Sequence, residues 1–504
     1  MHISVLIDEA TTISNKSTMI IYLKCTSVPT SNAHFMFLDL VELENQKADT
    51  IVSTLLNCLA MYGFDDTYLT EHLIAFASDG ASVMTGNKSG VALQIANKYP
   101  NIVTWHCLNH RIELAVADAA ADTTGVNHLR SFMDALYSLY SRSPKTQKRL
   151  ETEAAELDIQ LKKIGRVLNT RWVASSFRAV DAVWNNFSCL AAHFESSSNP
   201  SSAHYDKALR STFNGLHTKL CSPQFVLDLA LMYDCLEEIK YLSESLQKRN
   251  TTIPEADKLI RRTIRRIEGF KEKPGLKMTE AESARQSLLL GVTRLTVNSK
   301  HVVINHKQFL QSLADNLKRR LMTVTTDGSG AHVASGSTQQ QESHSKKLID
   351  QLSVLNPDNW PAEMEFDYGE EQIRLLCRRF RLHYCTARDA YSDFKDSGGR
   401  KMPLGLNLLM NAVNTIPVST VECERGFSVM NVIFGERRAK LLVQHVSALM
   451  FIKHHGPPLL QWQPLRYVKS WLLKHRSASD TRTRKSASTG DTSMQKPDPQ
   501  WSIL

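Results

Sequence analysis

The stretch ISVLIDEA, residues 3–10, is a short apolar run with two acidic residues near its end, and four similar runs follow it within the first 125 residues. These are STMIIYLKCTSV (17–28), AHFMFLDLVEL (33–43), HLIAFASD (72–79) and NIVTWHCL (101–108). All are rich in β-branched or aromatic residues and flanked by polar or turn residues, which is typical of strands. Residues 45–64 and 89–99 have helical spacing instead. This order of elements predicts a mixed sheet flanked by helices.

The pattern changes between about residues 125 and 400. Long segments such as FVLDLALMYDCLEEIKYLSESLQKR (225–249) carry apolar residues three and four positions apart, which predicts helices. Residues 324–346 are rich in Gly, Ser, Gln and His, and the chain from residue 476 is basic and polar, so we expect a flexible loop and a disordered tail. The predicted fold class is therefore α/β plus all-α.

Composition limits the class of protein. A chain of 504 residues is long enough for several domains. No apolar run approaches the roughly 18 residues that a membrane span needs, and no signal-like segment leads the sequence. Nine cysteines at irregular spacings favour reduced thiols in an intracellular protein. The net charge of +9 permits a polyanionic partner such as nucleic acid.

Three carboxylates are candidates for a metal-dependent site. Asp8 and Asp79 end the first and fourth strand runs, and carboxylates at the C-terminal ends of strands lie at the sheet edge where α/β folds bind ligands. Glu424 lies far downstream, in ECERGFS (422–428). If its helix packs on the same sheet, the three carboxylates meet, and they match the ligands that a pair of Mg²⁺ ions requires. Alternatively, each is a cap, turn or ion-paired residue.

Five motifs together resemble the hAT transposases and the vertebrate proteins derived from them. They are LIDEAT (6–11), SDGASVMTG (78–86), WHCLNHRIEL (105–114), NTRW (169–172) and ECERGFS (422–428). The resemblance spans about residues 1–460 and implies that Asp8, Asp79 and Glu424 form a catalytic triad that uses Mg²⁺ or Mn²⁺.

The same resemblance implies a division into domains. It predicts a ribonuclease H-like core beginning at 1–124, a helical insertion at 125–400, and a C-terminal core helix with a dimerisation region at 401–460. We expect the N-terminal BED zinc finger of the family to be missing, and the family's location implies the nucleus.

Further residues match family motifs that act near the active site. Cys107 and His110 would orient catalytic groups or DNA, or else form a buried cysteine and a hydrogen-bonded histidine that support the fold. No second ligand pair has suitable spacing, so no structural zinc is expected. Arg171 and Trp172 match the RW motif: the guanidinium would bind phosphate and the indole would stack on a displaced base, unless the indole is a core anchor.

The C-terminal motif predicts self-association. Leu442, Val446, Leu449 and Met450 share one helical stripe, with Phe427 nearby. The pattern alone favours packing in the chain's own core, whereas the resemblance implies contact with a second copy.

Three functions remain open from the sequence. The first is a hAT-derived protein that self-associates and binds DNA, with a residual Asp/Asp/Glu phosphodiester-transfer site. The second is an active but truncated DNA transposase. The third is an adaptor resembling the SUMO ligases of transposon origin, with the SUMO machinery as its partner.

Overall fold

A five-stranded mixed sheet forms the first part of the computed structural model, which describes residues 2–26, 33–86, 88–167, 172–200, 205–297, 302–322, 348–435 and 438–474. The strands are β1 (Ile3–Thr11), β2 (Ser17–Thr26), β3 (Ala33–Glu42), β4 (Leu73–Ser78) and β5 (Val103–His106). Their order is β3-β2-β1-β4-β5. β2 is antiparallel to β1 and β3, whereas β4 is parallel to β1 and β5.

Strand alternation gives the sheet two buried faces. The helices α1 (Ala48–Met61) and α4 (Val91–Lys98) cover one face of the sheet, and Ile3, Val5 and Ile7 of β1 point to that face. Two shorter helices, α2 (Asp66–His72) and α3 (Ser82–Thr85), lie between α1 and α4 in the chain. Leu6 points to the opposite face and belongs to a second core. Because successive side chains alternate, Asp8 lies on the same face as Leu6.

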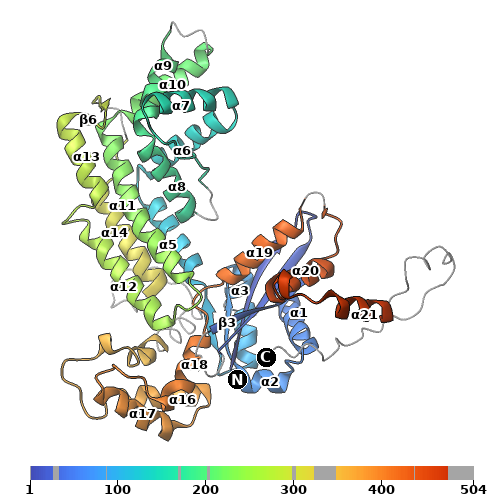
Figure 1. Ribbon diagram of the computed structural model, residues 1–504. Helices are drawn as coiled ribbons and strands as arrows, with labels where there is room; N and C mark the ends of the chain where they lie inside the picture. The colour runs from blue at the N-terminus through green and yellow to red at the C-terminus, as the bar shows by residue number, and fades with distance from the viewer. Residues whose placement is uncertain are drawn as a thin grey trace, which may run out of the picture.

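Helices follow β5 directly. α5 (Leu108–Asp122) packs against α8, α11 and α14, so the helical part begins immediately after the sheet's last strand. The remaining elements are α6 (Val126–Ser141), α7 (Pro144–Glu156), α8 (Trp172–Asn185), α9 (Phe187–Ser198), α10 (Lys207–Leu220), α11 (Pro223–Leu246), α12 (Ile253–Gly269), α13 (Leu276–Ser287), the short strands β6 (Leu289–Leu290) and β7 (Thr293–Arg294), α14 (His306–Leu317) and a π-helical turn (Lys318–Met322). Figure 1 shows this helical part beside the sheet, with the long α11 among its neighbours.

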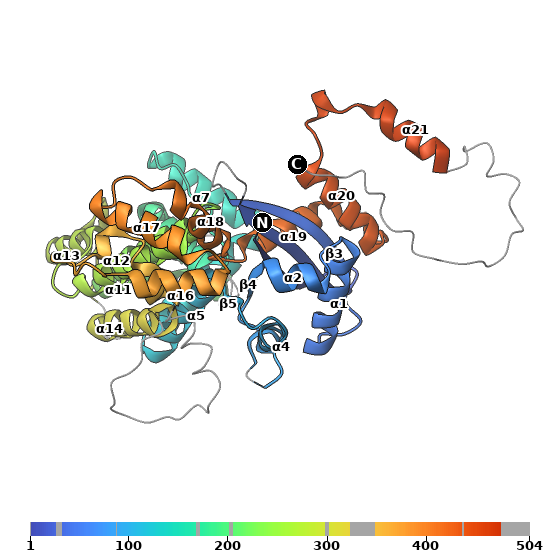
Figure 2. The same ribbon diagram turned by 90° about the horizontal axis from the view of Figure 1, so that it is seen from below.

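The chain then returns to the sheet. α16 (Glu370–Phe380) and α17 (Tyr384–Asp396) pack together and lead, through a 3-10 turn (Leu404–Leu406), to α18 (Asn407–Thr415) on β2, β3 and β4. α19 (Val421–Ile433) lies on β1 and β2, and α20 (Val443–His455) lies on β3. α21 (Pro464–Lys474) extends away from the body in both views (Figures 1 and 2). Segments hundreds of residues apart therefore share one face of the sheet.

The predicted mixed α/β architecture with many helices is confirmed, and each of the five predicted strands is present. The likeness to ribonuclease H and the domain boundaries stay predictions. The predicted flexible loop at 324–346 and the tail from 476 lie outside the described residues. Among the helices that the structure describes, none is long and apolar enough to cross a membrane.

Candidate carboxylate site at the sheet edge

Asp8 and Asp79 lie on neighbouring parallel strands. Leu6 of β1 is paired with Ala77 of β4, and extending this register by two residues sets Asp8 beside Asp79, which directly follows β4. Asp79 is held by a hydrogen bond in which the backbone N–H of Ala81 donates to its Oδ1 at 3.2 Å. The two carboxylates therefore share one edge of the sheet, as the sequence predicts.

The pKa of Asp8 links these two carboxylates to Glu424. It is raised from 3.8 to about 7, first by burial and then by the charge of Asp79, and Glu424 adds to the effect. A hydrogen bond from the backbone N–H of Glu9 to Oδ1 of Asp8, 2.9 Å long, opposes the rise. The pKa of Glu9 is also raised by burial and by Asp79. Negative charge therefore accumulates here from three distant parts of the sequence.

Asp8→Asn is expected to stabilise the metal-free protein in a pH-dependent way. Because the folded-state pKa lies above the ordinary value, the folded state holds a proton that the unfolded state has lost, so stability falls as pH rises from about 4 to about 7. The asparagine variant lacks this penalty. Its free energy of unfolding in urea should exceed that of the parent by about 4 kcal/mol at pH 8 and differ little at pH 4. Equal stability of the two proteins at both pH values would contradict the burial of charge at Asp8.

Glu424 reaches this edge because α19 is fixed to the sheet. The backbone N–H of Thr420, which precedes the helix, donates to Sγ of Cys107 at 3.3 Å. The indole N–H of Trp105 donates to the carbonyl oxygen of Val418 at 3.1 Å. Gly426 lies so close to Ile20 and Tyr22 of β2 that a Cβ would clash with both. Ile20 is the strand partner of Asp8, so the helix passes directly over the candidate site.

Glu422, two residues earlier, has a different role. It is buried, and Oε1 and Oε2 accept hydrogen bonds from Nε and an Nη of Arg249 at 2.9 and 2.8 Å, while Arg425 also contacts it. Burial by itself would raise the pKa of Glu422, but the two arginines outweigh it and lower the pKa. Arg249 follows α11, so this ion pair ties the helical part to α19.

Arg249→Ala should therefore destabilise the fold. Removing Arg249 leaves the buried Glu422 with Arg425 alone, and a hydrogen-bonded charge lost in this way costs about 1.5–3 kcal/mol. The loss of stability should appear as a lower urea midpoint of unfolding at pH 7. It should become smaller at acidic pH, because the ion pair stabilises the fold only while Glu422 is ionised and this contribution is lost as pH falls through the lowered pKa of Glu422. Lys248→Ala, at the exposed neighbouring residue, is the matched control and should leave the midpoint unchanged.

Two histidines border the Asp79 loop. A Cβ on Gly80 would collide with the rings of both His106 and His110, so only glycine lets them approach this closely. Burial, followed by the charges of Arg111, His110 and Arg320, lowers the pKa of His106 to about 3 and keeps its imidazole neutral. Its Nε2 is buried and has no hydrogen-bond partner among the described residues.

The other motif residues lie in different surroundings. Cys107 is buried and accepts the hydrogen bond from Thr420, so it supports the fold and is not exposed for the predicted contact with DNA. Arg171 and the side chain of Trp172 lie outside the described residues. Glu113, three residues after His110, accepts a hydrogen bond from the backbone N–H of Val173 at 2.9 Å. The start of α8 is thereby anchored to the helix that carries His110.

The predicted dimerisation stripe divides between two faces of α20. Val446 and Met450 are fully buried in the chain's own core, unlike the contact with a second copy that the resemblance implies. Leu442 and Leu449 are exposed, and Phe427 is partly buried against the core. α20 is apolar on both sides, so periodicity alone does not tell the core-facing side from the exposed one.

The carboxylates suit a hard divalent cation by their chemistry, since Mg²⁺ and Mn²⁺ prefer oxygen ligands and would relieve the repulsion that raises the pKa of Asp8. Oε1 of Glu9 is buried without a hydrogen-bond partner in the described ranges. As the side chains stand, no three or more His, Cys, Asp or Glu residues of the described part are grouped closely enough to hold an ion. Binding at this edge would therefore draw the carboxylates together.

Sequence reasoning missed three residues of this region: Glu9, Glu113 and Arg249. Glu9 is adjacent to Asp8 in LIDEAT, so the motif itself contains the signal that a second carboxylate lies at this edge. The partners of Glu113 and Arg249 lie 60 and 173 residues away along the chain, so no local pattern indicates them.

The C-terminal part of the chain matches a known family. Residues 404–455 match the hAT family C-terminal dimerisation region. This segment contains α18, α19 and α20, and with them both Glu424 and the exposed side of α20. The match supports a protein derived from a hAT transposase that self-associates.

Proposed function

We propose that this chain is a hAT transposase-derived protein that pairs with a second copy through its C-terminal region and binds DNA, with Asp8, Asp79 and Glu424 as its phosphodiester-transfer site. The observation that carries the proposal is the position of Glu424. It lies within the matched dimerisation region and also adds to the electrostatic field at Asp8. One helix thus connects the proposed interface to the proposed site.

The interface we propose is an apolar ridge made of Val432, Leu442, Leu449 and Ile452. Val432 is 83% exposed, Ile452 64% and Leu449 40%. Leu449 and Ile452 are three positions apart and so are neighbours on α20, and both are exposed whereas Val446 and Met450 are buried. Large apolar side chains that are exposed in this way favour contact with another protein. The matched region makes a second copy of this chain the natural partner.

Deleting residues 404–455 would not test this interface, because α18, α19 and α20 cover a face of the sheet and their loss would expose its core. The test uses the full chain. Sedimentation equilibrium over a range of concentrations should give twice the mass of one chain, 56.8 kDa, or a higher multiple. A single-chain mass throughout would overturn the proposal of self-association.

At the sheet edge, the chain's own residues would perform three tasks. Asp8, Asp79 and Glu424 would hold the divalent ions, which when bound activate water and stabilise the leaving oxygen of a phosphodiester. The neutral His106 borders the Asp79 loop without adding positive charge. α19 keeps Glu424 at the edge because the helix is held at two points: the N–H of Thr420, just before the helix, donates a hydrogen bond to Cys107, and Glu422 accepts hydrogen bonds from Arg249.

The raised pKa of Asp8 gives this proposal a pH signature. Because Asp8 must lose its proton to bind a cation, and its pKa is about 7, metal binding should strengthen as pH rises from 6 to 8. Calorimetric titration of the full chain with Mn²⁺ at these two pH values measures the change. Affinity independent of pH over this interval would contradict a role for Asp8 as a ligand.

A further inference from the structure

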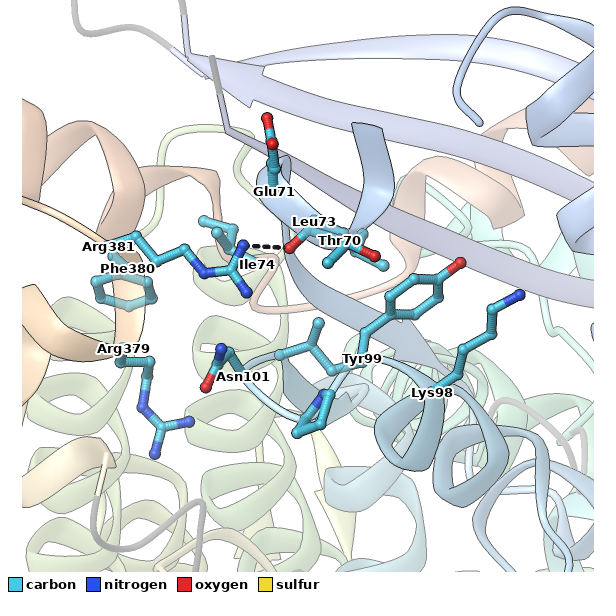
Figure 3. Close-up of a pocket in the computed structure, with 12 residues that line it drawn as sticks. Thr70, Glu71, Leu73, Ile74, Lys98, Tyr99, Asn101, Arg379, Phe380 and Arg381 are labelled. Carbon is cyan, nitrogen blue, oxygen red and sulfur yellow. Dashed lines mark hydrogen bonds between the residues drawn. The ribbon is translucent and has the colours of Figure 1, made fainter. Parts of the chain in front are cut away.

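A pocket with a mixed apolar and polar lining lies at the opposite end of the sheet's parallel strands from the carboxylates (Figure 3). Three separate segments line it: the end of α2 and start of β4, the turn between α4 and β5, and the end of α16. Its lining includes Arg379, Arg381 and Asn101, and the two guanidinium groups lie on either side of Asn101 in the figure.

Arg379 is the unusual member of this set. Its side chain is half-buried, and no hydrogen bond or ion pair reaches its guanidinium from the part of the chain that the structure describes. Burial lowers the pKa of Arg379. A charged group removed from water without a partner is costly, so it marks a place where an anion would be stabilised.

Arg381 is already oriented toward the same pocket. It ends α16 in a left-handed conformation with φ of 54°, and an Nη donates to the carbonyl oxygen of Thr70. A guanidinium has five N–H donors, so one bond to Thr70 leaves several for a ligand.

The acidic residues near the pocket do not neutralise these two arginines. Glu71 lines the pocket, but its carboxylate pairs with His72 at 3.8 Å and points away from both guanidinium groups in Figure 3. Lys98 is paired with Asp66 at 2.9 Å. Neither Arg379 nor Arg381 therefore has an ion-pair partner among the described residues.

We propose that Arg379, Arg381 and Asn101 bind a phosphate group. Two guanidinium forks and a side-chain amide supply planar N–H donors that match phosphate oxygens, and arginine binds phosphate in a bidentate way. These donors come from the end of α16 and the α4–β5 turn, two separate segments that meet at the pocket. The source of the phosphate is either the backbone of DNA or a small phosphate compound.

This site is separate from the carboxylates. Leu73, which lines the pocket, is the first residue of β4, and Asp79 directly follows the last. The two residues are six positions apart, so at ~3.3 Å per residue the pocket and the carboxylates are about 20 Å apart. Asp79→Asn should therefore leave phosphate binding here unchanged. Failure of this site is thus distinguishable from failure of the proposed transfer site.

The test compares Arg379→Gln with Arg374→Gln in the full chain. Arg374 lies on the same helix, is exposed and pairs with Glu371, so its loss changes net charge equally without touching the pocket. One arm measures the ³¹P line width of inorganic phosphate in the presence of protein. The other measures the anisotropy of a fluorescein-labelled, random-sequence DNA duplex over a series of KCl concentrations.

Arg379→Gln should abolish the line broadening that the parent protein causes, while Arg374→Gln retains it. If DNA is the source, Arg379→Gln should also weaken duplex binding about fivefold to tenfold and reduce the salt slope by about 1. Loss of broadening with unchanged duplex binding would indicate a small phosphate compound. Arg381→Gln, which alters the pocket from its exposed side, provides the same readouts if Arg379→Gln does not fold. Broadening and duplex binding that are the same in these variants as in the parent would overturn the proposal.

Discussion

Asp79→Asn is expected to abolish the metal-dependent nicking of supercoiled DNA by the full chain. Asp79 lies beside Asp8 at the edge of the sheet, and its charge is one reason why the pKa of Asp8 is raised. Replacing this carboxylate by an amide removes a charged oxygen ligand from the set that would hold Mg²⁺ or Mn²⁺. The rate of nicking should fall about 10³-fold, which corresponds to about 4 kcal/mol of transition-state stabilisation.

The control is Glu44→Gln, which removes a carboxylate that is exposed between β3 and α1. It should nick DNA at the parent rate. If Asp79→Asn is as active as Glu44→Gln, the carboxylates are not catalytic. If the folded, self-associated parent protein does not nick DNA with Mg²⁺ or Mn²⁺, the phosphodiester-transfer part of the proposal is wrong, and self-association stands independently of it.

The second large effect is expected at the apolar ridge. The double substitution Leu449→Asp and Ile452→Asp places two charges on the exposed side of α20, where a second copy would exclude water. Burying unpaired charges in an interface costs several kcal/mol, so the dissociation constant should rise by about 10²-fold or more. Sedimentation equilibrium should then give the mass of a single chain at concentrations where the parent protein is associated.

Leu276→Asp is the matched control for the ridge. Leu276 is 80% exposed at the start of α13, so its substitution adds a charge at an exposed apolar residue in the helical part. It should not change the oligomeric state. If the double variant remains associated while its unfolding transition is normal, the chain pairs through another surface, for which the exposed Leu465 and Trp471 of α21 are the next residues to substitute.

The sheet was predictable because its signal is local. Each strand of β1 to β5 is an apolar run bounded by polar residues, and the alternation in β1 also determines that Asp8 and Leu6 share a face. The placement of Asp8 and Asp79 at one edge follows from the same reasoning about strand ends. Glu424 is different, because its position depends on α19 packing on β1 and β2, and the sequence offered only the family resemblance for that.

The side chains that hold α19 were not predictable from local pattern. The Cys107 thiol and the Thr420 N–H are 313 residues apart, so a motif that looks catalytic carries a structural hydrogen bond. The two-sided apolar character of α20 similarly concealed that Val446 and Met450 belong to the core. The exposed fraction of each side chain, and not its spacing, separates Leu449 and Ile452 from them.

The central claim is that Glu424 shares a cation site with Asp8 and Asp79, and Mn²⁺ binding by Glu424→Gln and Glu422→Gln tests it most directly. The two glutamates are two residues apart, about 200° around α19, and Glu422 is engaged by Arg249. Electron paramagnetic resonance of free Mn²⁺ in solutions of each folded variant measures the affinity. We expect Glu424→Gln to weaken binding at least about tenfold, which is about 1.4 kcal/mol, and Glu422→Gln to retain it. Equal affinity in the parent and in Glu424→Gln would contradict the convergence of the three carboxylates.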